Sequence, residues 1–383
     1  MDKPTVQDIF HRFYPAYLDQ YSPSPVQAKV AHNIMNCKTG AYGANVCVCE
    51  DCGFIQIHYN SCRNRCCPMC QAVPKEMWMD ARREDILDAP YFHLVFTVPD
   101  ILNPVIYSNQ RLLYDALYHA ASSTISELTA DPKHLGAKVG YICILHTWGS
   151  EMNFHPHIHA ILLGGGLASN NQWKDNGENF FLPIRVISKM FRGKYLEELK
   201  RLWKEDKLVF HGTAEKFRNH YTFKELLDSC YGMDWIPHCK KTFNGAQTVM
   251  KYLGKYTHRI AVSNHRIVRM DDDTVTFLVK DYRNEGQWKE LTISGVEFVR
   301  RFLMHVPPRR FVRIRHYGLL CSRTKSQKLT LCRNLLGCKK YLSKLRDMEM
   351  PEILEHLYGI KVCVCKACGG HLGKPQMRMP LRC

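Results

Sequence analysis

The sequence of 383 residues has no uninterrupted apolar run of about 18 residues, the shortest run that spans a bilayer as a helix. Its first residues, MDKPTVQDIFHRF, lack the basic and then apolar segments of a signal peptide. It has no repeat of fixed period and no long low-complexity segment. These absences argue against membrane, secreted and repeat proteins, and we expect a globular protein of the cytoplasm.

Acidic residues are scarce relative to basic ones, with 36 Asp and Glu against 53 Lys and Arg and a net charge of +17. Between Arg300 and Arg346 there are fourteen Lys or Arg and no Asp or Glu. A basic surface attracts polyanions, so nucleic acid is the expected partner. The candidate DNA-binding residues are Arg300, Arg301, Arg309, Arg310, Arg313 and Arg315.

Cysteine, in contrast, is abundant, and eight of the 18 cysteines lie between residues 37 and 70. Cys49 and Cys52 form one C-x-x-C pair, and Cys67 and Cys70 form another, with fourteen residues between the pairs. Two such turns supply the four thiolates of a tetrahedral zinc site. The segment is short and polar, so zinc would supply folding energy that a small core cannot. The pattern therefore predicts structural zinc bound by Cys49, Cys52, Cys67 and Cys70.

The other cysteines leave further metal sites open. A second four-thiolate site in the same segment is a hypothesis, and its ligands would be Cys37, Cys47, Cys62 and Cys66. A smaller group near the end consists of Cys363, Cys365, Cys368 and His371. These four residues either complete a local metal site or belong to a frayed terminus with reduced thiols.

Helical and strand patterns follow one another in mixed order, which is typical of the α+β class. Apolar spacing predicts two short helices within residues 5–36, and further helices around residues 112–118 and 191–203. Aromatic and β-branched runs predict strands at residues 91–97, 141–148 and 155–163, the last ending at three glycines. Residues 275–279 and 288–293 predict a further hairpin.

Two histidines lie two residues apart in one of these predicted strands, at His157 and His159. Residues two apart on a strand point to the same face, so the two imidazoles form half of a site for a divalent cation. Manganese suits such ligands, and magnesium does so when substrate phosphate completes the shell. His155 is a candidate third ligand, and incidental structural histidines are the alternative.

A pair of tyrosines, Tyr252 and Tyr256, lies in a predicted helix over residues 246–261. Residues four apart share one helix face, and Lys255 lies on an adjacent side. Aromatic residues on such a stripe are often core, which is the structural alternative. Phenols beside a metal site in a basic chain are instead the components needed to cut a phosphodiester through a protein-linked intermediate.

At these residues the sequence resembles the HUH transposases of the insertion-sequence ninety-one type, the two-tyrosine rolling-circle transposases. The resemblance extends from about Cys37 to about Cys321 and rests on five motifs in the expected order. They are NSCRNRCCPMCQ (60–71), FTVP (96–99), TWG with HPHIH and GGG (147–166), YLGKYTHR (252–259), and RRFLMH with RIRHYG (300–318). Cys66 and Asn45 depart from the family pattern, which concerns individual zinc ligands and leaves the catalytic motifs intact.

The resemblance implies an antiparallel, ferredoxin-like sheet that carries the two histidines beside a helix that presents the tyrosines. His157 and His159 would bind magnesium or manganese. Tyr252 or Tyr256 would attack single-stranded DNA at a transposon end, forming a 5′-phosphotyrosine, and Lys255 would neutralise phosphate charge. Target DNA is the second expected substrate.

The expected organisation has three parts. Residues 1–80 would form a helical, cysteine-rich zinc-binding domain, and residues 85–265 an HUH catalytic domain. Residues 266–383 would form a basic DNA-binding region with its own candidate zinc site. The protein would be associated with the bacterial nucleoid through DNA.

Three other functions remain as alternatives at the level of sequence. A rolling-circle replication initiator or a relaxase shares the same chemistry, and the N-terminal cysteine segment favours a transposase over both. A zinc-containing DNA-binding regulator would have structural histidines and tyrosines. A TIM-barrel metal hydrolase would require eight β-α repeats, whereas hairpins are predicted here.

Overall fold

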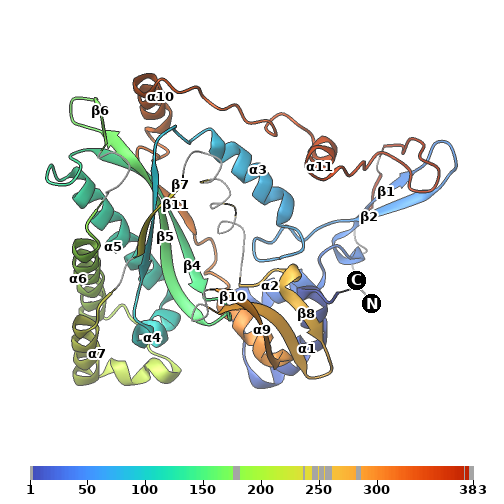
Figure 1. Ribbon diagram of the computed structural model, residues 1–383. Coiled ribbons are helices and arrows are strands. Elements are labelled where there is room, and N and C mark those ends of the chain that lie inside the picture. Colours follow the sequence, from blue (N-terminus) through green and yellow to red (C-terminus); the bar gives the residue numbers. More distant parts are fainter. Residues whose placement is uncertain are drawn as a thin grey trace.

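The computed structural model describes residues 3–175, 182–235, 238–243, 249, 254, 261–281, 286–374 and 376–378 (Figure 1). The α-helices are α1 (Val6–Gln20), α2 (Pro25–Met35), α3 (Ala72–Arg83), α4 (Asn103–Ser108), α5 (Gln110–Ala130), α6 (Ile184–Lys204), α7 (His220–Gly232), α9 (Gly295–Met304), α10 (Lys325–Leu336) and α11 (Met350–Tyr358). The strands are β1 (Ala44–Val48), β2 (Ile55–Tyr59), β3 (Tyr91–Thr97), β4 (Lys138–Trp148), β5 (Phe154–Leu167), β6 (Trp173–Asp175), β7 (His238–Phe243), β8 (Ile267–Met270), β9 (Thr274–Asp281), β10 (Gln287–Ser294), β11 (Ile314–Gly318) and β12 (Gln376–Arg378).

The largest sheet has the strand order β11-β4-β5-β3-β7, with β6 paired to the far end of β5. Every pairing in it is antiparallel. The predicted α+β class is confirmed, and the predicted histidine strand is β5 at the centre of this sheet. An antiparallel sheet rules out a TIM barrel, whose strands are parallel.

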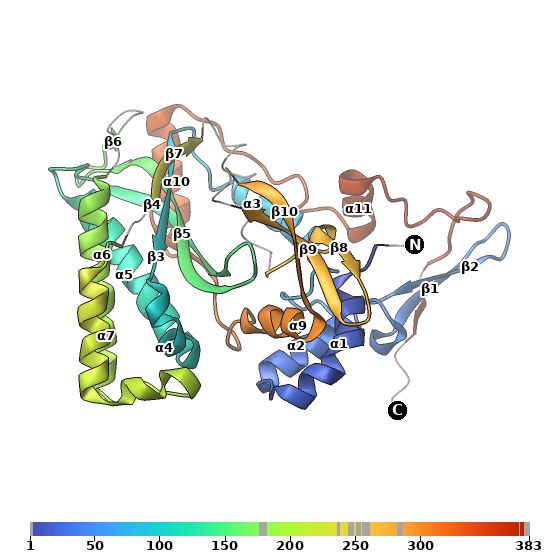
Figure 2. The same cartoon turned by 60° about the horizontal axis from the view of Figure 1, so that its bottom comes forward.

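Different helices pack on the two faces of this sheet (Figures 1 and 2). One face packs on α4, α5, α6 and α7 and forms the largest apolar core. The opposite face packs on α3, α10 and Val249. Alternate residues of each strand therefore enter separate cores.

Three consecutive glycines, Gly164, Gly165 and Gly166, lie inside β5, although the sequence predicted that the strand ends there. A Cβ atom at Gly164 would collide with the Pro90 carbonyl, and one at Gly165 with the Trp173 ring. The glycines permit close approach of neighbouring backbone and rings, so here they lengthen the strand.

The two predicted N-terminal helices are confirmed as α1 and α2. The Thr5 and Asp8 side chains each hydrogen-bond the other's backbone amide and cap α1. Ser24 is the N-cap of α2, and Pro25 occupies the first turn of that helix. Both helices pack against α9 and the hairpin of β9 and β10 in a second apolar core. The hairpin predicted over residues 275–293 is also confirmed.

The expected third domain is not a separate unit. Strand β11 pairs with β4 in the central sheet, and α9 packs on the N-terminal helices. At the end of the chain, β12 pairs with β1, so the C-terminal segment lies beside the N-terminal hairpin of β1 and β2 (Figure 1). The order of predicted helices and strands could not reveal these contacts, because the paired strands β11 and β4, and β12 and β1, lie far apart in the chain. No helix in the described part of the chain is long and apolar enough to cross a membrane.

Candidate active site and metal centres

Three histidines converge on the face of the central sheet that is covered by α3. His157 and His159 come from β5, and His146 lies opposite His157 on β4. One ring nitrogen from each lies within 4.8 Å of the others, and the Nε2 atoms of His157 and His159 are 3.0 Å apart. Two nitrogen ligands at about 2.1 Å from one ion and at right angles would be roughly 3.0 Å apart. The spacing therefore fits a shared divalent ion.

Polar contacts behind these rings set which nitrogen faces the centre. His157 Nδ1 donates to the backbone carbonyl of His155 at 2.6 Å, because a carbonyl can only accept. His159 Nδ1 lies 2.9 Å from Nε2 of His93 on β3. Contacts of this kind fix the tautomer and orientation of metal-binding imidazoles and leave Nε2 for the ion.

Burial keeps these rings neutral near pH 7. Loss of hydration lowers the pKa of His157 to about 3, and it lowers the pKa of His159 well below its usual range. A neutral imidazole is the form that binds a metal, so both side chains are ready to act as ligands.

The predicted third ligand, His155, does not join this cluster. Its ring is half-exposed and lies 3.3 Å from Asp100. His146 lies beside His157 and His159 instead, because the antiparallel register places it directly opposite His157 on the neighbouring strand. The prediction followed one strand only. Pairing the predicted strand 155–163 with 141–148 would have revealed His146, and pairing it with 91–97 would have revealed His93.

The candidate nucleophiles Tyr252 and Tyr256, together with Lys255, lie outside the described residues. Two neighbours in the same segment, Val249 and Gly254, are described, and both are helical. Val249 is buried in the core on the histidine-bearing face of the sheet. A Cβ at Gly254 would collide with the Met79 thioether, so the backbone there lies directly against α3.

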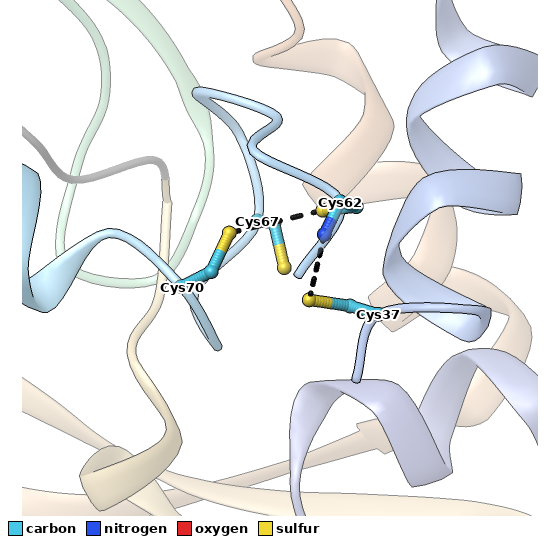
Figure 3. Close-up of side chains that lie close together, drawn as sticks. All are labelled: Cys37, Cys62, Cys67 and Cys70. Atoms are coloured by element: carbon cyan, nitrogen blue, oxygen red, sulfur yellow. Dashed lines mark hydrogen bonds between the residues drawn. The ribbon is translucent and has the colours of Figure 1, made fainter. Parts of the chain in front are cut away.

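A first cysteine cluster joins Cys37, Cys62, Cys67 and Cys70, whose sulfur atoms all lie within 4.8 Å of one another (Figure 3). Cys62 and Cys70 Sγ are 3.8 Å apart, and the Cys62 amide donates to Cys37 Sγ at 3.5 Å. Cys37 follows α2, and the other three lie in the loop before α3. The cluster packs against the second apolar core.

A second cysteine cluster joins Cys49 and Cys52 to Cys365 and Cys368. The predicted grouping of Cys49 and Cys52 with the Cys67 pair is therefore wrong. Cys49 and Cys52 lie at the turn of the β1–β2 hairpin, and the Cys67 pair lies beyond that hairpin near α2.

The remaining cysteine predictions also change. Within the described part of the chain, neither Cys47 nor Cys66 belongs to a group of potential metal ligands, although both are buried. Cys363 is exposed, and His371 lies 3.4 Å from Glu50 and is not among the grouped ligands of the described residues. The C-terminal pair is thus part of a site shared with the N-terminal hairpin.

The acid-free basic stretch acquires carboxylate partners in the fold. Arg300 and Arg301 both bind Glu297 in the preceding turn of α9. Arg315 binds Asp115 and stacks over Tyr118, and Arg313 lies over the ring of Trp148. Further pairs are Lys325 with Asp85 at 2.7 Å and Arg346 with Glu84 at 2.6 Å.

Arg309 and Arg310 differ from these neighbours. Both are exposed, in the loop between α9 and β11, and no carboxylate partner is found for either in the described ranges. Among the six candidate DNA-binding arginines, these two keep their charge available to an outside anion.

Comparison with known proteins gives consistent matches over both halves of the chain. Residues 9–98 match a family described as "Transposase zinc-binding domain", and residues 140–328 match one described as "Putative transposase". The chain is 40% identical over 369 residues to "Putative transposase y4qJ" of Sinorhizobium fredii, covering 95% of this chain and 93% of that protein.

It is 30% identical over 309 residues to "Transposase for insertion sequence element IS801" of Pseudomonas savastanoi pv. phaseolicola, covering 79% of this chain and 72% of that protein. No solved structure is significantly similar to the chain.

Proposed function

Because the chain belongs to the insertion-sequence ninety-one family of transposases, with an N-terminal zinc-binding domain, we propose that it nicks and rejoins single-stranded DNA at element ends through a 5′-phosphotyrosine. One observation carries this mechanism. Three buried histidines converge on the sheet face against which Val249 of the tyrosine segment is packed.

Two described residues of the tyrosine segment, Val249 and Gly254, have contacts on that side of the sheet. Val249 shares an apolar core with residues of β3, β4 and β5, and the backbone at Gly254 lies against Met79 of α3. Tyr252 lies between these two positions in the sequence, and Tyr256 follows two residues after the second. This supports a short path from either phenol to a phosphate bound at the histidines.

His146, His157 and His159 would hold the catalytic ion, which we propose is magnesium or manganese. When bound, this ion would act as a Lewis acid on the scissile phosphate. The protein supplies ligand orientation through His93 and the His155 carbonyl. It also supplies a water-poor site, since all three ligand side chains are buried.

In the proposed cleavage, the phenol oxygen of Tyr252 or Tyr256 bonds to phosphorus as the phenol loses its proton. The bond from phosphorus to the 3′ oxygen breaks, and that oxygen takes up a proton to become a 3′-hydroxyl. The second tyrosine would perform the next cleavage or strand transfer. Lys255 would stabilise negative charge on the phosphate.

The zinc-binding domain and the exposed arginines would serve DNA binding. We assign zinc to Cys37, Cys62, Cys67 and Cys70, because all four fall within the matched zinc-binding region. Arg309 and Arg310 would contact DNA phosphates, giving an affinity that falls with salt. We place the protein at its DNA substrate in the cytoplasm.

Replacement of the tyrosines tests the assignment. Purified protein is mixed with labelled single-stranded element ends and manganese, and covalent adducts are separated on a denaturing gel. We expect an adduct with the unaltered protein and none with Tyr252→Phe/Tyr256→Phe. The matched control is Tyr221→Phe, which changes an exposed tyrosine on α7, the helix layer of the opposite sheet face. An adduct that persists in the double variant would refute the proposal.

A further inference from the structure

Two short turns at opposite ends of the chain have the same structure. One contains Cys49 and Cys52 at the tip of the β1–β2 hairpin, and the other contains Cys365 and Cys368. In each turn the first cysteine's amide donates to the carbonyl five residues later, at 2.9 Å for Cys49 and 2.8 Å for Cys365. The two turns therefore present their sulfur atoms in the same way.

The match extends to the glycine that closes each turn. Gly53 and Gly369 both follow the second cysteine, and their amides donate to the first cysteine's carbonyl at 3.0 and 2.9 Å. Their φ angles are 70° and 79°, in the left-handed region that favours glycine. In the C-terminal turn, amides also donate to Cys365 and Cys368 Sγ at 3.4 Å. Amide donors to sulfur stabilise the thiolate form.

The distances between sulfur atoms distinguish a metal site from disulfides. Cys49 and Cys368 Sγ are 3.5 Å apart, and Cys52 and Cys365 Sγ are 3.7 Å apart. A disulfide requires about 2.05 Å. Four thiolates at about 2.3 Å around one tetrahedral zinc ion would lie roughly 3.8 Å from one another.

The sheet of β12, β1 and β2 that surrounds these turns has a very small apolar core. Its core contains only Cys47, Cys49, Cys365 and Leu372 among the described residues. Large side chains on β2 face solvent instead, with Ile55 59% exposed and Tyr59 52% exposed. A three-stranded sheet with so small an apolar core needs another source of folding energy, and a bound metal would supply it.

We propose that Cys49, Cys52, Cys365 and Cys368 bind a second structural zinc ion, which clasps the C-terminal end of the chain to the N-terminal hairpin. The C-terminal cysteines lie beyond both matched family regions, which end at residues 98 and 328. Zinc is preferred because four thiolates are its usual ligand set in structural sites and it has no redox chemistry, which suits an ion whose proposed role is structural.

The segment that leads to the C-terminal cysteines is already attached to α3 at its other end. Asp80 on α3 accepts hydrogen bonds from Tyr341 at 2.6 Å and from the Leu345 amide at 3.0 Å. The residues after Leu345 run through α11 to the cysteine turn. Loss of the clasp should therefore free residues 361–378 and leave the Asp80 anchor in place.

Native mass spectrometry and elemental analysis of the full chain test the proposal. We expect two zinc ions per chain in the unaltered protein and one in Cys365→Ser/Cys368→Ser. The matched control is Cys321→Ser/Cys363→Ser, which removes two other exposed cysteines and should keep both ions. One zinc ion in the unaltered protein, two in the Cys365 variant, or iron in place of zinc would overturn the proposal.

Alkylation of the unaltered protein gives a test that does not depend on folding of a variant. Cys52 and Cys368 are exposed, as are Cys321 and Cys363, so accessibility alone predicts similar reactivity. We expect Cys52 and Cys368 to react at least about tenfold more slowly, because zinc occupies their thiolates, and to match the controls after chelation. Equal rates before chelation would refute the clasp.

Discussion

The histidine cluster and the second cysteine cluster are both sets of metal-binding side chains, but they are assembled over different distances in the chain. His146 and His157 face each other across one antiparallel ladder, joined by a short turn. Cys52 and Cys365 are 313 residues apart in sequence. A sheet ladder orients its side chains by itself, whereas loops brought from distant segments depend on the ion to hold them. Substitutions in the histidine cluster should therefore lower the cleavage rate, and substitutions in the cysteine clusters should lower the stability of the fold.

Replacement of a central histidine should give the largest effect. We expect His157→Ala to lower the rate of manganese-dependent cleavage by at least about 10³-fold, or about 4 kcal/mol, because an ion ligand is lost. The fold should remain, since the ladder around residue 157 is made by backbone groups. Single-turnover cleavage and circular dichroism measure the two effects.

The matched control is His155→Ala, on the same strand with its ring directed to Asp100. Its backbone carbonyl, which orients His157, is retained. A large loss of cleavage in this variant, with His157→Ala active, would mean that the cluster is assigned to the wrong histidines.

Replacement of a cysteine in the first cluster should instead reduce stability. We expect Cys62→Ser to lower the free energy of unfolding by about 4 kcal/mol or more, because the zinc is lost from a cluster packed in the second core. Urea unfolding with and without a chelator measures this effect.

Cys66→Ser is the matched control, because Cys66 is buried in the same core but lies outside the cluster. A cost of about 1 kcal/mol is typical of such a change. Equal losses in the two variants, both insensitive to chelator, would contradict the zinc assignment.

The smallest effect concerns the basic residues. Arg309→Ala/Arg310→Ala should reduce the slope of log affinity against log salt for single-stranded DNA by roughly 1.4, at about 0.7 per phosphate contact. Arg315→Ala should leave the slope unchanged, because Asp115 and the Tyr118 ring already hold that guanidinium. Fluorescence anisotropy over a salt series measures both slopes. If only Arg315→Ala changed the slope, Arg315 and not the exposed pair Arg309 and Arg310 would be the residue that contacts DNA phosphate.

Local patterns in the sequence predicted much of the fold and part of the site. Alternation along β5 placed His157 and His159 on one face, and apolar spacing within residues 5–36 placed the first two helices correctly. These features depend on residues within a few positions of one another.

Features that join distant segments were missed or misassigned. The spacing of two C-x-x-C pairs suggested one zinc site, but Cys49 and Cys52 meet a pair from the other end of the chain. His146 required the register between two strands, and the partners of Arg315 and Arg346 come from α5 and the end of α3. Sequence spacing alone does not contain these tertiary pairings.

The protein-linked DNA intermediate is the most direct test of the proposed chemistry. Full-length protein is incubated with manganese and labelled single-stranded element ends, digested with protease, and the DNA-bound peptide is sequenced by mass spectrometry. We expect a 5′-phosphate linked to Tyr252 or Tyr256, on the segment that also contains Val249 and Gly254. A nick with no attached peptide, or DNA attached to a different residue, would contradict the assignment of these tyrosines to the histidine cluster.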